Sequence, residues 1–421
     1  MKRILQFVLV LVAGLSANAQ QVQGSVSMGA GYANMAYYKL ATSTEVNAVA
    51  SSWDIAFLRT SSFSFGARIN DQKGISVFEA SINPADWSTI DLNNIANWPQ
   101  LYNSETAWET GAFDNASYNA DNGYPLGYGW GEYNMSTHHI TGKVIFVLEY
   151  TDGTYRKFMI EDFYGGYAIK YATWDGTTWG ADQTYTVSNS TNPNNIFNYF
   201  DLATGAEVVV EPASTDWDLL FTQYNTDYFG DGTMMYPVTG VLHHPDLEVA
   251  KNDESVSSDT SNLTFETDIN TIGYDWKTYS GGSYTVNTTM AYYIKYTDDT
   301  IYRLTFATFE GSATGVVTFN FEDVTNAMAT ETFGNDVSFG VYPNPSYDKK
   351  VTVVYDIPGG VSVDNTISVY TINGEKVFDK TINANEGFYN TTLDLSSLSG
   401  GVYLLKMQSG DFSGTKKLIL N

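Results

Sequence analysis

The chain reads AYYKLATSTEV at residues 36–46 and SSWDIAF at residues 51–57. Both pieces return later in the same order, as NYFDLATGAEV at residues 198–208 and STDWDLLF at residues 214–221. In the first copy, Trp53, Ile55 and Phe57 are apolar and occupy every second position. In the second copy, Trp217, Leu219 and Phe221 do the same. Side chains that alternate in this way lie on one face of a β-strand. We therefore expect each copy to contribute a strand with one buried face to a duplicated β-fold.

A further pair of motifs supports the duplication. VLEYTDGTYRKF at residues 147–158 is matched by YIKYTDDTIYRL at residues 293–304. Asp-Gly and Asp-Asp interrupt these runs, which is typical of the tight turn of a β-hairpin. We expect two related units, residues 20–194 and residues 195–330, with a long insertion in the first. The insertion contains four tryptophans: Trp87, Trp98, Trp108 and Trp130.

Length and composition predict an all-β protein of several domains. The 421 residues exceed the usual size of one domain, and aromatic residues, which favour strands, make up 15% of the chain. No long stretch carries apolar residues at helical spacing, while turn-forming residues interrupt the chain about every ten residues. Two tandem β-sandwich-like domains fit this pattern.

Charge and cysteine content narrow the possible functions. The net charge is −26 with only 21 lysines and arginines, which disfavours nucleic acid as a partner. The chain has no cysteine, so disulfides, thiolate metal sites and the lipid-bearing cysteine of a lipoprotein are excluded.

The segment 1–19 predicts a secretory signal peptide. Lys2 and Arg3 precede an apolar run, and Ala17 and Ala19 occupy the small-residue positions of a cleavage site. The apolar run is shorter than the roughly 20 residues that a membrane-spanning helix needs. We expect an exported protein that begins near Gln20 and has no transmembrane segment.

The C-terminal region, residues 337–421, follows a short linker at 331–336 and has its own pattern. It carries YPNP at 342–345, an Ile-Asn-Gly turn at 372–374, and LSSLSGGVYLLK at 395–406. These motifs resemble the type A C-terminal sorting domain of the type IX secretion system of Bacteroidetes-type bacteria. The resemblance implies a small Ig-like β-sandwich, recognition by the outer-membrane translocon, and delivery to the cell surface or the medium.

The two upstream units resemble the HmuY-type haem-binding family. The resemblance is carried by the YFDLATGAEV-like turn, the Trp-Asp strand and the later Asp-Gly hairpin. It implies an HmuY-type β-domain in each unit and a pocket for haem or another small planar ligand. In that family two axial side chains, His or Met, hold the haem iron, because both are good ligands for low-spin iron.

The candidate haem ligands do not repeat between the two units. They are the histidine pairs and nearby methionines: His138, His139, His243, His244, Met135, Met234 and Met235. Neighbouring residues of a strand point to opposite faces, so each histidine pair can give one ligand to a site. A His–Met pair, Met ligands and no haem site all stay open. Arg59 and Arg68 are the candidate partners for haem propionates.

Other chemistry has weaker support in the sequence. Asp54 and Asp218 recur after the tryptophans, but one carboxylate per unit gives no acid–base pair, and we expect them to bond neighbouring backbone. Acidic residues and glycines at 227–233 lack the spacing of an EF-hand and predict a plain turn. The aromatic segment 122–133 suits the wall of a pocket for a planar ligand, a platform for a sugar, or the cover of a sandwich end. Motifs of known hydrolases and nucleotide-binding enzymes are absent.

The sequence thus predicts a secreted or cell-surface ligand-binding protein that is not an enzyme. Haem binding in an HmuY-like domain is one hypothesis. The alternative is a surface adhesin, a glycan-binding protein or a structural protein without a haem site, in which exposed aromatic residues make the contacts.

Overall fold

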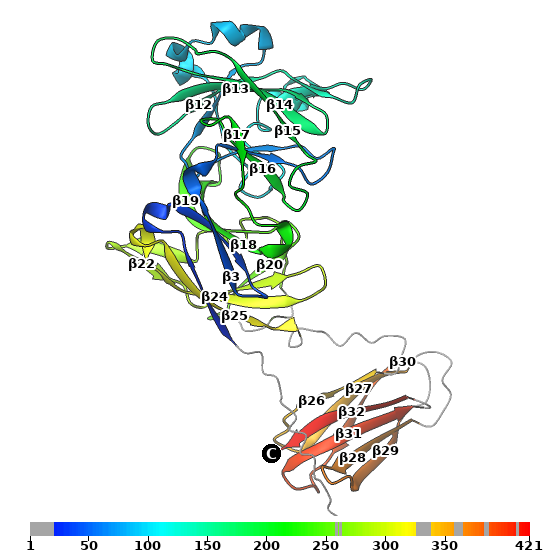
Figure 1. Ribbon diagram of the computed structural model, residues 1–421. Coiled ribbons are helices and arrows are strands. Elements are labelled where there is room, and N and C mark those ends of the chain that lie inside the picture. The colour runs from blue at the N-terminus through cyan, green and yellow to red at the C-terminus, as the bar shows by residue number, and fades with distance from the viewer. Residues whose placement is uncertain are drawn as a thin grey trace, which may run out of the picture. The chain divides into compact units, whose positions relative to one another are not determined.

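The computed structural model describes residues 21–256, 260, 263–325, 338–357, 365–382, 387–409 and 412–421. The chain divides into two compact units, residues 1–328 and 329–421 (Figure 1). Both are built from antiparallel strand pairs, which confirms the predicted all-β class. The predicted signal peptide and the predicted linker lie outside the described residues.

The first unit has two lobes, each with a small four-stranded sheet and a larger sheet. In the first lobe the small sheet has the order β17–β16–β4–β5, formed by β4 (Ile55–Leu58), β5 (Ala67–Ile69), β16 (Phe197–Asp201) and β17 (Ala206–Val208). The large sheet contains β6 (Ser76–Ser81), β7 (Gln100–Leu101), β10 (Gly131–Tyr133), β11 (Ile140–Gly142), β12 (Ile145–Glu149), β13 (Tyr155–Phe163), β14 (Gly166–Thr173) and β15 (Gln183–Ser188). The insertion adds the pair β8 (Tyr118–Asn119) and β9 (Tyr128–Gly129) and the short helices η3 (Pro84–Thr89), η4 (Leu92–Asn97) and η5 (Ala120–Asn122).

The second lobe repeats this plan without the insertion. Its small sheet has the order β19–β18–β2–β3, formed by β2 (Asn34–Lys39), β3 (Thr44–Val49), β18 (Leu219–Asp227) and β19 (Met235–His243). Its large sheet has the order β1–β25–β24–β23–β20, formed by β1 (Val22–Ser27), β20 (Glu248–Asp253), β23 (Met290–Lys295), β24 (Ile301–Phe309) and β25 (Val316–Asp323). The remaining elements are the hairpin β21 (Lys277–Ser280) and β22 (Ser283–Val286) and the single turns η1 (Ala30–Tyr32), η2 (Ala50–Ser52), η6 (Ser214–Asp216) and η7 (Gly311–Ala313).

The two repeats exchange strands between the lobes. β2, from the first repeat, pairs with β18 of the second repeat, and Tyr37 lies opposite Leu220. β16, from the second repeat, pairs with β4 of the first repeat, and Tyr199 lies opposite Ala56. The predicted boundary at residues 194 and 195 falls between β15 and β16. Each lobe is therefore assembled from both repeats, and Figure 1 shows β3 of the first repeat in the same lobe as β18, β20 and β24 of the second.

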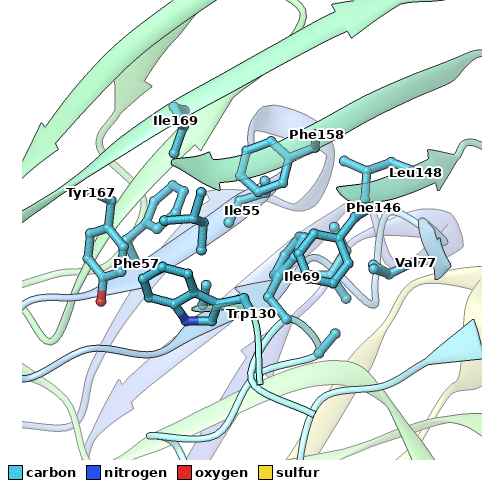
Figure 2. Close-up of a cluster of buried hydrophobic side chains, with 14 of the residues drawn as sticks. Ile55, Phe57, Ile69, Val77, Trp130, Phe146, Leu148, Phe158, Tyr167 and Ile169 are labelled. Carbon is cyan, nitrogen blue, oxygen red and sulfur yellow. The ribbon is translucent and has the colours of Figure 1, made fainter. Parts of the chain in front are cut away.

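Each lobe encloses an aromatic core between its two sheets. In the first lobe, Phe57 of the small sheet lies beside Tyr167 of the large sheet and close to Trp130 of the insertion (Figure 2). Phe146 and Phe158 of the large sheet belong to the same cluster. In the second lobe a similar cluster includes Trp276. Burial of such large apolar side chains is the main favourable contribution to folding.

A third core joins the lobes, between their small sheets. Here the same pair of rings occurs twice: Trp53 meets Tyr199 edge-on with ring centroids 4.9 Å apart, and Tyr37 meets Trp217 at 5.4 Å. In each pair one ring comes from the first repeat and the other from the second. The exchange therefore places a buried contact between the repeats at the centre of the unit.

The second unit is a small β-sandwich, as predicted. Its sheets have the orders β26–β27–β30 and β29–β28–β31–β32, formed by β26 (Ser338–Tyr342), β27 (Lys350–Ile357), β28 (Asn365–Thr371), β29 (Lys376–Ile382), β30 (Gly387–Asp394), β31 (Gly401–Ser409) and β32 (Phe412–Leu420). Apolar side chains of both sheets, including Val353 and Leu405, form one core. Gly374 in the predicted turn has a φ of 85°, a conformation that glycine adopts without strain.

Candidate functional site

An open cleft of about 450 Å³ lies on the first lobe, at the end of the large sheet where β14 turns into β15. We call it the tryptophan cleft. The side chains on its walls that could contact a ligand are Trp87, Trp174, Trp179, Lys157, Thr178 and Asp182. Its volume falls in the usual range for small-ligand sites.

The insertion places Trp87 in this cleft. η3 begins after Asn83, whose side chain accepts the Ala85 N–H at 3.2 Å and so caps the helix. Trp87 then packs on the outer face of the large sheet beside Ile145. Its indole N–H donates to an Asp182 carboxylate oxygen at 2.9 Å, which links the insertion to the chain before β15.

The turn between β14 and β15 supplies the other two tryptophans. Asp175 accepts the N–H groups of Thr177 and Thr178 at 2.8 and 2.7 Å, and these hydrogen bonds lower the pKa of its carboxyl. The closed turn brings Trp174 and Trp179 together, with ring centroids 5.2 Å apart in an edge-on arrangement. The Trp179 indole N–H donates to the Ile90 carbonyl at 2.8 Å.

Lys157 of β13 lies at the base of the cleft and is only 3% exposed. Its ammonium donates to the Trp87 carbonyl at 2.8 Å and lies 4.5 Å from the Trp87 ring centroid and 5.3 Å from that of Trp179. Burial lowers the pKa of this ammonium. Lys170 lies 4.5 Å from the same Trp87 ring and forms an ion pair with Glu161 at 3.0 Å.

The cleft therefore combines ring faces with hydrogen-bonding groups of both kinds. Indole faces stack on the C–H surfaces of flat or ring-shaped ligands, while a carboxylate accepts and an ammonium donates. Sequence reasoning identified Trp87 as part of the insertion but missed Trp174, Trp179, Lys157 and Asp182. The usable signal was WDGTTW at residues 174–179, two tryptophans on either side of an Asp-Gly turn.

The first histidine pair lies on the exposed connection between β10 and β11. His138 has a positive φ of 61° and its Nδ1 bonds the Tyr133 hydroxyl. His139 Nδ1 lies 2.7 Å from an Asp162 carboxylate oxygen, and its ring stacks on Tyr164 at 4.5 Å. The two imidazoles are thus held by different neighbours.

The second histidine pair lies at the end of β19 and is buried. His243 Nδ1 is 2.9 Å from its neighbour's carbonyl oxygen, and Nε2 is 2.8 Å from the Asp268 carbonyl oxygen. Both ring nitrogens of His243 are therefore occupied by backbone. His244 packs edge-on against Trp217 at 4.6 Å, accepts the Asp246 N–H at Nδ1, and has its pKa lowered by burial to about 4.

The three candidate methionines are dispersed. Met135 is 71% exposed on the β10–β11 connection, and Met234 is 42% exposed just before β19. Met235 lines a different cleft of about 240 Å³ that has no histidine on its wall. It begins the nine-residue strand that His243 ends, so these two lie roughly 27 Å apart at 3.4 Å per residue.

Around β19 the described residues do not fit a haem site of the predicted kind. The buried pair offers no free nitrogen on His243, and the other candidates lie on an exposed connection or at the far end of β19. The Arg59 guanidinium donates to backbone carbonyls at Asn189, Pro193 and Asn195, and that of Arg68 to those at Ser104, Ala107, Trp108 and Thr110. These contacts occupy both candidate partners for propionates.

The remaining predicted features have structural explanations. Asp54 and Asp218 are buried and accept backbone N–H groups, but from Leu202 and Leu40 of the other repeat and not from the neighbouring backbone that the sequence suggested. In the aromatic segment 122–133, Trp130 is fully buried in the core of the first lobe. Asp227 accepts the N–H groups of two glycines in the turn that begins with it.

Two features are absent from the described part of the chain. No group of three or more His, Asp or Glu side chains there is arranged to hold a metal ion. None of its helices has the length and apolar character needed to cross a membrane.

Comparisons with known proteins identify the C-terminal part. Residues 340–421 match the secretion system C-terminal sorting domain family, which confirms that prediction for the second unit. The protein is therefore exported by type IX secretion to the cell surface or the extracellular space. No family match supports the resemblance of the two repeats to the HmuY-type family, and no curated protein matches the chain.

Proposed function

We propose that this exported protein binds carbohydrate at the tryptophan cleft and acts outside the cell by binding, without catalysis. The observation that carries the proposal is the meeting of Trp87, Trp174 and Trp179 in one open cleft beside Lys157 and Asp182. Sugar rings present C–H faces that stack on indole and hydroxyl groups that bond carboxylates and ammonium groups.

The location of the cleft supports the same function. Its tryptophans come from the insertion and from the β14–β15 turn, and they stand on a sheet that is held by the core beneath it. The indole N–H groups of Trp87 and Trp179 are hydrogen-bonded to Asp182 and to the Ile90 carbonyl, which holds these rings in place, so little side-chain entropy is lost on binding. The second lobe lacks the insertion and hence the counterpart of Trp87.

A glycan array probed with the purified full chain tests this proposal. We expect binding to a subset of glycans and a loss of about tenfold, or about 1.4 kcal/mol, for Trp174→Ala, which removes one wall of the cleft. Tyr279→Ala is the matched control, because it removes a 66% exposed aromatic ring from the second lobe. Equal binding by both variants, or no binding by the parent protein, would contradict the proposal.

Haem binding at the β10–β11 connection is the second candidate function. The observation in its favour is His139, whose Nδ1 bonds the Asp162 carboxylate, because such a bond orients an imidazole for metal ligation through Nε2. When bound, haem would supply a planar porphyrin and an iron that accepts this nitrogen. A haemin titration followed at the Soret band, compared between the parent chain and His139→Ala, tests it. A spectrum that is identical for both proteins would exclude His139 as a ligand.

A further inference from the structure

We infer that the tryptophan cleft selects carbohydrates that carry a carboxylate, such as chains containing uronic acids, and that Lys157 is the residue that recognises this group. The inference rests on the proposed carbohydrate binding and specifies the ligand class. It starts from the position of one ammonium group at the base of the cleft.

Lys157 is under-satisfied where it lies. Its side chain is almost completely buried, yet its ammonium makes one hydrogen bond, to the Trp87 carbonyl, and otherwise faces the rings of Trp87 and Trp179. An ammonium has three N–H donors, so two of them face the indole rings and have no oxygen or nitrogen acceptor among the described residues of the free protein. Burial also lowers the pKa of this group, so its charge is disfavoured in the free protein.

A ligand carboxylate would supply the hydrogen-bond acceptors and the negative charge that the Lys157 ammonium lacks. It would accept the remaining N–H donors of Lys157 in charge-assisted hydrogen bonds, which are about twice as strong as neutral ones. The ring of the same sugar unit could then stack on Trp174 or Trp179, which form the outer part of the cleft.

The charges around the cleft permit an anionic ligand in spite of the net charge of −26. Lys157 and Lys170 both lie 4.5 Å from the Trp87 ring centroid. Asp182 has one oxygen bonded to the Trp87 indole, and Glu161 is paired with Lys170. Two cations therefore offset these two carboxylates, and the carboxylate of Asp175 in the turn accepts two backbone N–H groups, so a carboxylate that enters at Lys157 meets less repulsion than the average surface exerts.

The test uses an array of matched pairs, in which oligosaccharides of several uronic acids stand beside their methyl esters and beside neutral glycans. Esterification removes the charge and adds one methyl group. We expect the full chain to bind at least one acid about tenfold or more tighter than its ester, since a hydrogen bond to a charged group contributes about that factor. Lys157→Met keeps the approximate volume of the side chain. It should lower the affinity for the acid to that for the ester.

The outcomes distinguish carbohydrate binding in general from selection of carboxylate-bearing carbohydrates. Equal or tighter binding of esters and neutral glycans would overturn the inference and leave carbohydrate binding intact, whereas no binding of any glycan would overturn both. If Lys157→Met fails to fold, salt dependence of the parent chain decides. Raising the salt from about 50 mM to about 500 mM should weaken binding of the acid and leave that of its ester nearly unchanged.

Discussion

Asp54 and Asp218 hold equivalent positions in the two repeats and make equivalent contacts. Asp54 accepts the N–H of Leu202 at 2.7 Å and pairs with Lys73 at 2.6 Å. Asp218 accepts the N–H of Leu40 at 2.7 Å and also pairs with a lysine. In each case the carboxylate belongs to one repeat and the amide to the hairpin of the other. The repeated aspartates thus fasten the exchanged hairpins.

Asp54→Asn should destabilise the first unit by about 2 kcal/mol. The substitution places an NH₂ group or a weaker acceptor against the Leu202 amide, and it leaves the mostly buried Lys73 charge with only its longer contact to Asp201 at 3.9 Å. Guanidinium unfolding measures the change. Asp121→Asn on the exposed η5 is the control and should change stability by less than about 0.5 kcal/mol. Equal stability of the two variants would show that the Asp54 contact does not hold the hairpin.

Glu211 predicts a pH dependence of stability. Its carboxylate accepts the N–H groups of Ile196 and Phe197, and burial raises its pKa from 4.5 to about 7. The folded state therefore keeps a proton that the unfolded chain loses near pH 4.5, and the stability from this group falls as the pH rises through about 7. The loss is on the order of 3 kcal/mol, because one pKa unit corresponds to about 1.4 kcal/mol.

Glu211→Gln should flatten this dependence, since glutamine keeps an acceptor and does not ionise. Unfolding free energies of both proteins, measured from about pH 5 to about pH 8, give the comparison. Burial also raises the pKa of Asp114 to about 7, but Asp114 is present in both proteins and cancels in the difference. Parallel pH profiles would show that Glu211 is ionised in the folded protein throughout.

For single residues, the sequence predicted which positions matter better than it predicted which residues they contact. Asp54 and Asp218 could be recognised because they repeat, and their bonding to backbone could be expected. Their true partners could not, because these come from the other repeat. The sequence suggested His243 and His244 as ligands because histidine is a common iron ligand. It could not show that backbone carbonyls lie against both ring nitrogens of His243.

Among the elements, the last strand of the sorting domain depends on the segment YPNP. The side chain of Asn344 donates to the Lys417 carbonyl at 2.7 Å and accepts the Ile419 N–H at 2.9 Å. It thereby pairs with the edge of β32 as a neighbouring strand would. The motif was recognised in the sequence as part of a family pattern, and the structure supplies the physical reason for its asparagine.

Asn344→Ala should destabilise the second unit by about 1 kcal/mol, because two hydrogen bonds at a solvent-exposed edge are replaced by water contacts. Unfolding of the full chain, followed by a probe in the second unit, measures this change. Asn390→Ala on the exposed side of β30 is the matched control. We also expect cells that carry Asn344→Ala to export less of the protein. Export at the parent level by a variant with lowered stability would show that the secretion system recognises the sorting domain without the Asn344 hydrogen bonds.

For the first unit as a whole, the sequence predicted that two similar repeats are present. It did not predict that the repeats exchange β-hairpins. The alternation in Trp53, Ile55 and Phe57 shows which face of a strand is buried, but a pattern of period two carries no information on which copy of the partner strand lies beside it. Both copies of the hairpin have nearly the same residues, so pairing within a repeat and pairing between repeats satisfy the same pattern. Only the geometry of the short connections between β3 and β4 and between β17 and β18 distinguishes them.

Cutting the chain between the repeats tests this arrangement. A protease site inserted between Thr191 and Asn192, in an exposed loop between β15 and β16, divides the two repeats. Because β2 is bound to β18 and β16 to β4, we expect the fragments to elute together in size-exclusion chromatography after cleavage. The core between the small sheets could also hold two separate domains together, so increasing denaturant must be added. Exchanged strands predict that the fragments dissociate only as the tryptophan fluorescence reports unfolding, whereas release of folded halves at lower denaturant would show that each repeat folds by itself.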